Sequence, residues 1–457
     1  STSPGRVVVA GVSSGVGKTT VATGLMAALA ASGVRVANAK VGPDFIDPGY
    51  HSLATGRPPR NLDPWLCGPA AIPGLAARAA SGADLLVVEG VMGLFDGADD
   101  GSPSSTADVA ALLDAPVVLV VDASAMSSSV AAVVRGFRDH DPRLHLAGVI
   151  CNRVGSERHA ALLRTAIAPL GIPVLGCLRR DDAFTWRDRH LGLVPVAEHH
   201  RTVRASITRL ADAVSRDIDV AAVAALARAA PALPSSSVAM PRRIGTARVA
   251  VATGAAFTFS YTDNIEALTA TGAEIVPFDP LRDERLPVSV DGLIVGGGFP
   301  EVFGTELAAN TTLMVDVRER MAAGLPTWAE CGGLLWLATR LDGRPMVGAL
   351  ETRATLGTTL YLGYRRVATT RRSPIGPAGT TFLGHEFHYS TCTPAGDGLT
   401  LSSARRSGPD GFASDTVVAT YVHHHAGGDP SLIEAFVDAT IRSRSPSSPG
   451  SRTGRRA

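Results

Sequence analysis

The stretch GVSSGVGKTT, which follows the first apolar run, carries the residue types of a phosphate-binding loop. The general pattern is G-x-x-x-x-G-K-[ST], with the first glycine five residues before the second. Five residues before Gly17 stands Val12, and the nearest glycine, Gly11, is one place too far. The N–H groups of a glycine-rich loop and the N-terminus of the next helix together bind anions. We therefore predict an ATP site despite the spacing, with these nucleotide-binding residues: Ser13, Ser14, Gly15, Val16, Gly17, Lys18, Thr19, Thr20 and Lys40.

Lysine is rare in this chain. Of 43 basic residues only two, Lys18 and Lys40, are lysine, and all the others are arginine. Arginine in place of lysine is typical of a GC-rich genome, so the two remaining lysines mark positions where arginine does not serve. A compact ammonium suits phosphate oxygens inside a tight loop better than a planar guanidinium does. We expect Lys18 to contact the outer phosphates and Thr19 to be a ligand of Mg²⁺.

Four acidic residues stand in loops or at strand ends where ligands bind. Asp44 and Asp47 lie in the Pro/Gly-bounded stretch VGPDFIDPGYH, for which turn formation is the alternative explanation. The run DLLVVEGVMGLFDG places Glu89 at the end of a buried strand and Asp96 in the loop after it. Open α/β sheets bind their ligands at the carboxyl ends of the strands. Glu89 is therefore predicted to be a Mg²⁺ ligand or to hold a water molecule.

A cysteine lies in the second half, between a predicted strand and a predicted helix. In LPTWAECGGLLWL, Cys331 is followed by Gly332 and Gly333, as at the sharp turn that presents a nucleophile in the G-x-S-x-G elbow. We expect the helix N-terminus behind Cys331 to favour the thiolate. The other four cysteines lack this context, and we expect them to be structural.

A cysteine nucleophile needs a base and a site for the oxyanion. The stretch ATYVHHHA offers His423, His424 and His425. In a strand His423 and His425 share one face and His424 the other, which argues against a shared metal ion. Upstream, the N–H groups of Gly297 and Gly298 in LIVGGGFPE are candidates for an oxyanion hole, with a plain tight turn as the alternative.

The elements that position these residues alternate as strand and helix. Strands are predicted at residues 6–10, 34–40, 85–89, 117–122, 146–151 and 174–176, with helices at 19–31 and 127–138 among the segments between them. This alternation favours a parallel sheet covered on both faces. After a Pro/Ser-rich stretch it restarts, with strands at 248–252, 273–277, 292–295 and 325–329, and β-like runs at 384–390 and 417–422.

The predicted architecture is thus two α/β domains. We expect a P-loop domain at residues 1–225, a linker at 226–246, a second α/β domain at 247–444 and a disordered tail at 445–457.

Bulk properties exclude several classes of protein. The net charge of +1 gives no basic field for nucleic acid. No stretch approaches the roughly 18 uninterrupted apolar residues of a membrane span, and we see no signal peptide. The five cysteines form no disulfide framework. We therefore expect a soluble, cytoplasmic protein with small-molecule partners.

Taken together, the motifs resemble a known family. KVGPDFIDPGYH and VEGVMGLFDG, followed by GGGFPE, AECGGLLWL, GHEFHYS and YVHHH, are similar in type and order to cobyrinic and hydrogenobyrinic acid a,c-diamide synthases. The resemblance runs from about residue 5 to about residue 440. The first half is similar to dethiobiotin synthetase and the second to class I glutamine amidotransferases, which have a flavodoxin-like fold. This branch of P-loop proteins tends to have a longer loop, which accounts for Gly11.

The resemblance implies a two-site synthetase that uses ATP, Mg²⁺ and glutamine. Cys331, assisted by His423, attacks the glutamine amide and releases ammonia, with Gly297, Gly298 and Gly332 at the oxyanion. ATP phosphorylates the a and c acetate carboxylates of the ring, and ammonia displaces phosphate. The acidic positions take part in substrate activation or metal binding, with Thr19 as a further metal ligand: Asp44, Asp47, Glu89 and Asp96, of which Asp44 and Glu89 are the predicted metal ligands. A homodimer is expected.

Two departures and several alternatives stay open. The residue two after His423 is His425, where many triad enzymes have Glu, and Phe299 stands where the family often has Tyr. The third member of the triad is therefore unassigned, as are the individual roles in GHEFHYS. Alternatives are cobyric acid synthase, nickel-sirohydrochlorin a,c-diamide synthase and, from another class, a partition-type ATPase. The Cys331 elbow disfavours the last, because a conformational switch needs no thiol.

Overall fold

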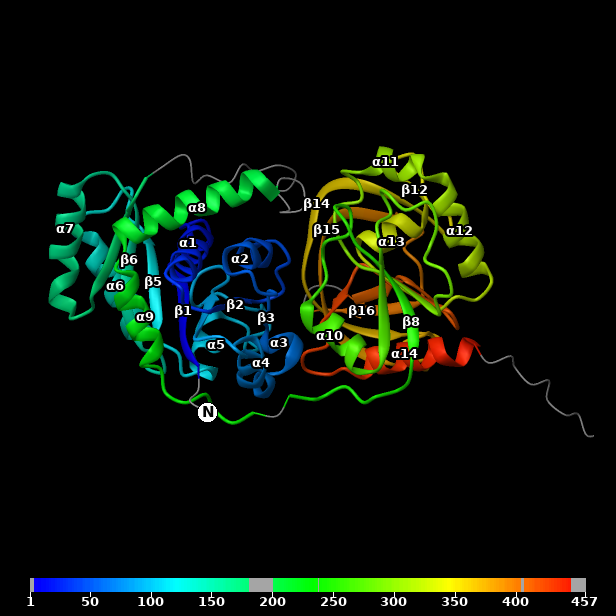
Figure 1. The fold of residues 1–457 in the computed structure, drawn as a ribbon, viewed down its shortest axis with the longest axis horizontal. Helices are drawn as coiled ribbons and strands as arrows, with labels where there is room; N and C mark the ends of the chain where they lie inside the picture. Colours follow the sequence, from blue (N-terminus) through cyan, green and yellow to red (C-terminus); the bar gives the residue numbers. More distant parts are fainter. Residues whose placement is uncertain (1–3, 181–199, 237, 404–406, 445–457) are drawn as a thin grey trace, which may run out of the picture. The chain divides into compact units, whose positions relative to one another are not determined.

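The computed structural model describes residues 4–180, 200–236, 238–403 and 407–444. The chain folds as two compact units. The N-terminal unit comprises residues 1–239, 258–264 and 425–429, and the C-terminal unit comprises 240–257, 265–424 and 430–457. Residues 231–236 and 238–246, between helix α9 and strand β8, carry no helix or strand (Figure 1). The predicted domain limits stay a prediction, and the predicted tail lies outside the described residues.

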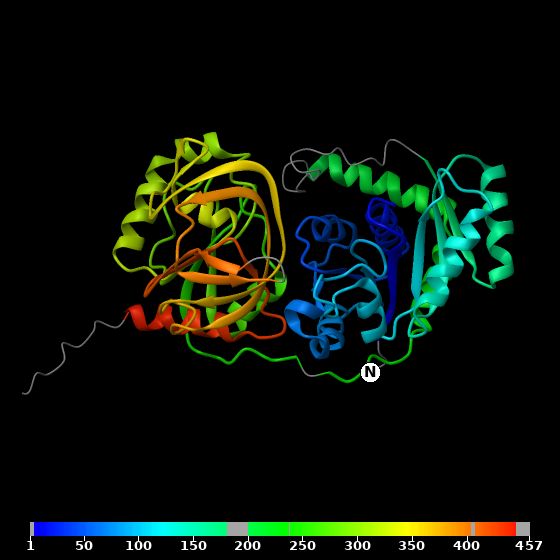
Figure 2. The ribbon, with the colours of Figure 1, turned by 180° about the vertical axis from the view of Figure 1, so that it is seen from behind.

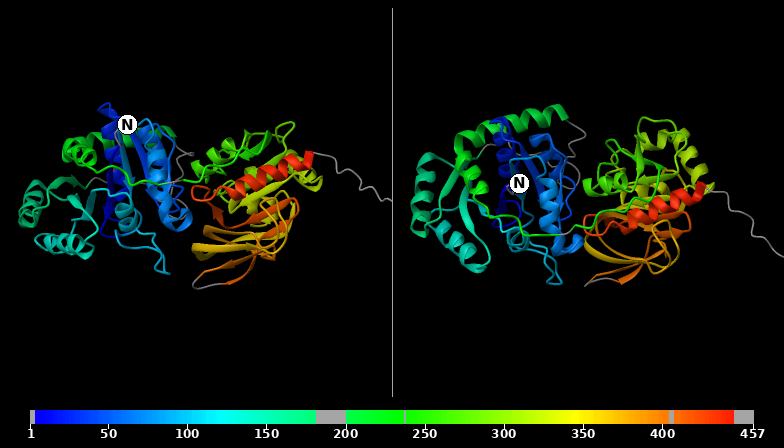
Figure 3. Two further views of the ribbon diagram at one scale, coloured as in Figure 1. Left: turned by 90° about the horizontal axis from the view of Figure 1, so that it is seen from below. Right: turned by 60° about the horizontal axis from the view of Figure 1, so that its bottom comes forward.

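The N-terminal unit is built on a parallel sheet whose strands are almost wholly buried. Apolar runs without alternation are what a parallel strand covered on both faces requires, and helices lie on both faces (Figure 3). In sheet order the strands are β3 (Asn61–Leu62), β2 (Val36–Val41), β4 (Leu85–Glu89), β1 (Gly5–Gly11), β5 (Val117–Asp122), β6 (Leu146–Val154) and β7 (Val174–Arg179). Every neighbouring pair in this sheet is parallel, as the alternation of strands and helices predicts.

The helices of the N-terminal unit pack in groups against this sheet. Helix α1 contacts α2, α8 and α9, α4 contacts α5, and α6 contacts α7. Their bounds are α1 (Lys18–Ala31), α2 (Asp47–Thr55), α3 (Pro64–Cys67), α4 (Ile72–Ala79), α5 (Thr106–Leu112), α6 (Ser129–His140), α7 (Glu157–Ile167), α8 (His200–Asp217) and α9 (Val220–Arg228), with 3-10 turns at Pro69–Ala71 and Ala168–Leu170. No helix of the described ranges has the length and hydropathy to cross a membrane.

The C-terminal unit contains two sheets, which form separate layers in Figure 3. The first is mainly parallel, in the order β18 (Phe412–Ser414), β19 (Val417–Thr420), β11 (Thr327–Glu330), β10 (Gly292–Val295), β8 (Ala247–Ala252) and β9 (Ala273–Phe278); only β18 pairs antiparallel. The second has the order β13 (Arg344–Pro345), β12 (Ala338–Leu341), β14 (Leu350–Thr369), β15 (Thr381–Thr393) and β20 (His423–His424), with β16 (Leu399–Ser402) and β17 (Ser407–Asp410) beside β14. The long β14–β15 hairpin arches over this unit in Figure 2.

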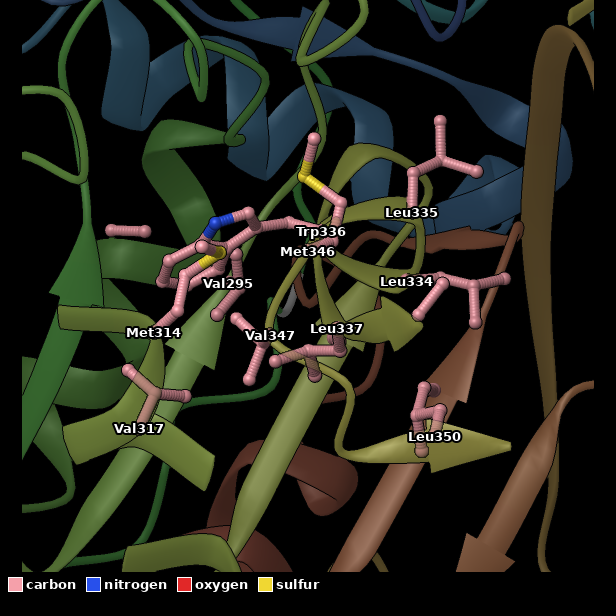
Figure 4. Packing of buried hydrophobic residues seen from close by; sticks show 14 of the residues in the cluster. Val295, Met314, Val317, Leu334, Leu335, Trp336, Leu337, Met346, Val347 and Leu350 are labelled. Atoms are coloured by element: carbon pink, nitrogen blue, oxygen red, sulfur yellow. The ribbon is translucent and has the colours of Figure 1, made fainter. Parts of the chain in front are cut away.

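The core of the C-terminal unit surrounds one short helix, α13 (Gly332–Leu337). Its side chains Leu334, Leu335, Trp336 and Leu337 are all buried, and they lie among Val295, Val347 and other apolar residues (Figure 4). Because α13 directly follows Cys331, packing of this helix fixes the position of the cysteine. The other helices of this part of the chain are α10 (Thr262–Ala270), α11 (Gly304–Ala309), α12 (Thr311–Ala322) and α14 (Ser431–Arg444).

Two short segments from the second half of the sequence belong to the N-terminal unit. Arg60 Nη1 donates to Asp263 Oδ1 over 2.8 Å, and Thr262 Oγ1 donates to the Pro59 carbonyl over 2.7 Å. Cys67 Sγ lies 3.3 Å from His425 Nδ1. Strand β20 ends at His424, so the predicted common face of His423 and His425 is wrong: His425 is outside the strand and packs in the other unit.

Candidate active sites

The loop between β1 and α1 closes around the side chain of Lys18. Lys18 Nζ donates to the Ser13 carbonyl over 3.0 Å, so the ammonium folds back across the loop. A Cβ at Gly11 would lie 2.8 Å from Lys18 Cδ and 2.6 Å from Val16 Cγ2. Gly11 is therefore needed where the stem of the lysine passes the end of the strand, which gives the displaced glycine a physical reason.

The rest of the loop is shaped by glycine and by a side chain from another strand. Gly17 has φ 91°, and a Cβ there would lie 2.2 Å from Asn152 Nδ2. This amide donates to the Val16 carbonyl over 2.8 Å and so ties the loop to β6. Ser14 and Gly15 are exposed at the tip, and Thr20 lies in the first turn of α1. The first turn of α1 holds no acidic residue, so its N-terminus is available to an anion.

Lys40, at the carboxyl end of β2, lies in a dense cluster of carboxylates. Its Nζ donates to Asp47 Oδ2 over 2.7 Å, to Glu89 Oε1 over 2.8 Å and to the Gly90 carbonyl over 3.1 Å. Thr19 Oγ1 lies within hydrogen-bonding distance of the same two carboxylates, 2.7 Å from Glu89 Oε1 and 3.2 Å from Asp47 Oδ2. The structure thus brings together residues that lie far apart in the sequence, where β1, β2 and β4 end.

The surroundings of the two lysines shift their pKa values in opposite directions. Burial lowers the pKa of Lys40, but Asp47 and Glu89 outweigh it and hold that pKa above its ordinary value. For Lys18, burial and then the charge of Lys40 lower the pKa to about 8. Burial also opposes ionisation of Glu89, yet Lys40 and His51 hold its pKa well below the ordinary range. Lys40 is therefore a fixed cation, and Lys18 is the cation with the weaker hold on its proton.

His51 is a further residue of this site, and it was not predicted from the sequence. His51 Nε2 lies 2.5 Å from Glu89 Oε2, and both side chains are fully buried. The signal was present, because His51 ends the quoted stretch VGPDFIDPGYH and so follows Asp47 by one turn of helix α2. Its partner could not be predicted from the sequence, because His51 lies in helix α2 and Glu89 lies in strand β4.

The two other acidic residues take different positions. Asp44 Oδ1 accepts the N–H groups of Ile46 over 2.7 Å and Asp47 over 3.2 Å, while Oδ2 stays 3.8 Å from Lys40 Nζ. Burial, and then the charge of Asp47, raise the pKa of Asp44 to about 7. Asp96 Oδ2 accepts the Gly93 N–H over 2.8 Å. The carboxylate that contacts the Thr19 hydroxyl together with Glu89 is that of Asp47, and not that of Asp44, which was the predicted metal ligand.

The donor set around Thr19 fits a magnesium ion that is shared with a nucleotide. In the described ranges, no three His, Cys, Asp or Glu side chains are placed to hold a metal ion. Magnesium in phosphate-transfer sites takes one or two carboxylates together with phosphate oxygens and waters. The hydroxyl of Thr19 between Asp47 and Glu89 supplies such a partial set, and ATP phosphates would complete it.

The second site centres on the backbone of Cys331. This residue joins β11 to α13 with φ 45° and ψ −103°, a strained conformation for a residue with a side chain. A Cβ at Gly333 would lie 2.1 Å from the Val295 carbonyl oxygen, so the turn requires glycine there. The predicted nucleophile elbow is present as a backbone geometry.

The loop that carries Gly297 and Gly298 lies against this elbow. A Cβ at Gly298 would lie 2.1 Å from the Ala256 carbonyl oxygen, and one at Gly332 would lie 3.0 Å from the N atom of Gly298. The N atom of Gly298 therefore lies close to Gly332, whose own N–H bonds to the Cys331 sulfur. Two neighbouring N–H groups in that place are what an oxyanion hole consists of. Gly297 precedes Gly298 in the same loop.

The expectation of a favoured thiolate at Cys331 does not agree with the structure. Burial raises the pKa of the Cys331 thiol, and the carboxylates of Glu301, Glu330 and Glu386 raise it further. Helix α13 has only six residues, too few to offset these effects. The thiol of the free protein therefore keeps its proton, and a base must remove it.

His423 lies in β20, which pairs with β15, so that His423 is opposite His385. Its Nδ1 is 3.6 Å from Glu330 Oε2, and the N–H of His424 donates to Glu330 Oε1 over 3.1 Å. Glu330 directly precedes Cys331, whose own N–H donates to the Thr420 carbonyl over 2.8 Å. A carboxylate for the histidine is thus present, but from the nucleophile strand rather than from the residue two after His423.

These two constellations define a class of protein: a P-loop nucleotide-binding domain joined to a glutamine amidotransferase domain. Residues 7–194 match the family model of the CobQ/CobB/MinD/ParA nucleotide binding domain, and residues 248–431 match that of the CobB/CobQ-like glutamine amidotransferase domain.

Relatives align over nearly the whole chain. Hydrogenobyrinate a,c-diamide synthase of Streptomyces coelicolor is 47% identical, over 95% of this chain and 97% of that protein. The enzyme of the same name from Thermobifida fusca is 45% identical, over 96% and 97%. Cobyrinate a,c-diamide synthase of Syntrophotalea carbinolica is 44% identical, over 95% and 98%. The chain belongs to the hydrogenobyrinate and cobyrinate a,c-diamide synthase family, which confirms the resemblance and the two predicted α/β domains.

Proposed function

We propose that this protein amidates the a and c acetate carboxylates of hydrogenobyrinic or cobyrinic acid, with ATP and glutamine as co-substrates. The observation that carries the proposal is the pairing of two chemistries in one chain. Thr19 and Lys40 meet the carboxylates of Asp47 and Glu89 in the N-terminal unit, next to the phosphate loop, and the C-terminal unit presents a cysteine on an elbow. Relatives named for this reaction cover nearly the full chain.

The N-terminal site suits the activation of a carboxylate. A carboxylate is a poor acyl donor at neutral pH, because it lacks a leaving group. In the proposed step a ring carboxylate oxygen attacks the γ-phosphorus of ATP, ADP departs, and an acyl phosphate forms. Lys18 and Lys40 stabilise the charge on the phosphoryl oxygens. Mg²⁺, when bound by Thr19 and Asp47 or Glu89, neutralises phosphate charge. Ammonia then attacks the carbonyl carbon, and phosphate leaves.

The C-terminal site suits the release of ammonia from glutamine. His423 accepts the proton of Cys331, whose sulfur attacks the amide carbon, and the Gly298 and Gly332 N–H groups stabilise the oxyanion. His423 returns the proton to the leaving ammonia, and water hydrolyses the glutamyl thioester. Glu330 orients the imidazole through Nδ1, the place that a third triad member takes.

The test is a product assay with both candidate acids. The protein is incubated with ATP, MgCl₂, glutamine and either hydrogenobyrinic or cobyrinic acid, and products are analysed by mass spectrometry. We expect a diamide, with one ADP, one phosphate and one glutamate formed per amide. Amidation of side chains other than the a and c acetates would instead support a cobyric acid synthase, and ATP hydrolysis without amidation would support a switch ATPase. A homodimer and a cytoplasmic location stay predictions.

A further inference from the structure

Three carboxylates act on the buried thiol of Cys331, and the structure gives each a different environment. After burial, the groups that raise the pKa of this thiol are Glu301 first, then Glu330 and Glu386. The proposed reaction uses only one of them. This carboxylate is Glu330, and the roles of Glu301 and Glu386 depend on the groups that surround them.

Two of the three carboxylates have partners within the protein. Glu386, which is fully buried, accepts from Arg365 Nε over 2.7 Å through Oε1. Glu330 accepts the His424 N–H and lies beside His423. Their charges are thus balanced or engaged in positioning the base.

Glu301 has no such partner. Among the described residues, no cationic side chain or side-chain donor lies within bonding distance of its half-buried carboxylate, to which its own backbone N–H donates. Burial raises its pKa to about 7, and the charge of Asp342 adds to this effect. A half-buried carboxylate without a cation is costly to keep ionised.

Glu301 is also placed at the edge of the nucleophile elbow. It follows Pro300, whose Cδ lies 3.0 Å from the position of a Cβ on Gly332. Gly298, three residues before Glu301, supplies an N–H of the candidate oxyanion hole. The loop that would bind the amide oxygen of glutamine therefore continues directly into this carboxylate.

We propose that Glu301 binds the α-ammonium group of glutamine and so selects glutamine over amides that lack this group. The inference rests on the proposed function, since it assigns a binding role in the glutaminase site. In an extended glutamine the α-nitrogen lies about 5 Å from the amide carbon, a separation that a glutamate beside the oxyanion loop can span. The ammonium supplies the cation that Glu301 lacks.

This role would couple ionisation of the Cys331 thiol to the binding of glutamine. With the site empty, three carboxylates raise the pKa of the Cys331 thiol, and only Glu386 among them is paired with a guanidinium, so the thiol keeps its proton. Glutamine brings a positive charge to Glu301, which removes the largest charge effect on the thiol. An amide without the α-amino group brings no such charge, so it binds weakly and leaves the thiol protonated.

The experiment compares Glu301→Gln with wild type on two substrates. Glutaminase kcat and KM are measured for L-glutamine and for glutaramate, which has the same amide but no α-amino group. We expect wild type to prefer glutamine strongly. In Glu301→Gln, KM for glutamine should rise about 30-fold or more, the effect of removing one partner of a desolvated charge pair. With glutaramate, kcat/KM should not fall and should rise, because the Glu301 charge that raises the pKa of the thiol is gone; the preference should therefore collapse.

Matched variants separate this role from a structural one. Glu306→Gln, at an exposed position in the neighbouring helix α11, should leave both substrates unaffected. Glu301→Asp keeps the charge and should retain part of the preference for glutamine; it is also the test variant should Glu301→Gln fail to fold. Denaturant unfolding of the C-terminal unit reports that each variant is folded, because ammonia-dependent amidation uses only the N-terminal site.

Two results would overturn the proposal. One is an unchanged preference for glutamine in Glu301→Gln, and the other is an equal loss with glutamine and glutaramate. Absence of glutaminase activity in the wild type would instead refute the proposed function itself, so the two failures are distinguishable.

Discussion

At the scale of single residues, the scarcity of lysine identified two residues of the phosphate site but did not show that their pKa values differ. The sequence singles out Lys18 and Lys40 because arginine stands at every other basic position. The structure places both beside Glu89, but in different states. Lys40 is locked between Asp47 and Glu89, whereas the pKa of Lys18 is lowered to about 8, chiefly by burial. A guanidinium has neither the compact shape nor the tunable proton of this site.

Lys18→Arg is therefore expected to impair ATP turnover by about 100-fold, the typical cost of one lost charge-stabilising donor. In wild type, kcat/KM for ATP should fall as the pH rises through about 8, because Lys18 loses its proton there. The variant should show low activity without that decline. The measurement is ATP turnover between pH 6 and about 10, with the exposed exchange Arg135→Lys as control. Near-normal turnover in Lys18→Arg would refute the argument from lysine scarcity.

Glu330 is the residue that supplies the missing carboxylate beside His423. Glu330→Gln keeps the size of the side chain and removes its charge, so the imidazolium that forms during the reaction loses its stabilisation. We expect glutaminase kcat to fall about 100-fold with little change in KM. Glu330→Asp should recover part of kcat, and ammonia-dependent amidation should persist in both variants. A rise in KM with unchanged kcat would assign Glu330 to binding instead.

At the scale of elements, contiguous motifs were predictable and long-range pairings were not. The phosphate loop and the elbow are each encoded within about ten residues, so strand, turn and helix could be read together. Three contacts of the two sites join residues from separate elements: His51 with Glu89, Glu330 with His423, and Asn152 with the phosphate loop. Hydrophobic periodicity carries no information on such partners. For the same reason it could not show that β20 stops at His424.

The elbow also gives a stability prediction. Gly333→Ala would place a Cβ 2.1 Å from the Val295 carbonyl oxygen, which is backbone in the central strand β10 and has little freedom to move. We expect a loss of about 3 kcal/mol in the free energy of unfolding of the C-terminal unit, as for severe overpacking. Gly408→Ala, where nothing lies within 4 Å of the added Cβ, is the control. Denaturant unfolding measures both, and equal stability of the two variants would show that the turn adapts.

At the scale of the whole molecule, the sequence predicted two α/β domains, and the limits given to them stay a prediction. The alternation of strand and helix restarts after the Pro/Ser-rich stretch, and this restart is what made the second unit visible. The second sheet of the C-terminal unit was missed, because the pairing of β14 with β15 and β12 depends on contacts between separate runs. Segments 258–264 and 425–429 belong to the N-terminal unit although they lie within the second half of the sequence.

Because the two chemistries belong to different units, they are expected to be separable. Cys331→Ala should lower glutamine-dependent amidation by about 1,000-fold or more, as expected when a nucleophile is removed. Amidation supported by added ammonium salts at alkaline pH should be largely retained, since Lys18, Lys40 and Glu89 are unchanged. Cys177→Ala, which removes a buried thiol outside the elbow, should preserve both activities. Loss of the ammonia-dependent reaction in Cys331→Ala would show that the phosphoryl-transfer site needs the intact cysteine, and the division of labour between the units would then be wrong.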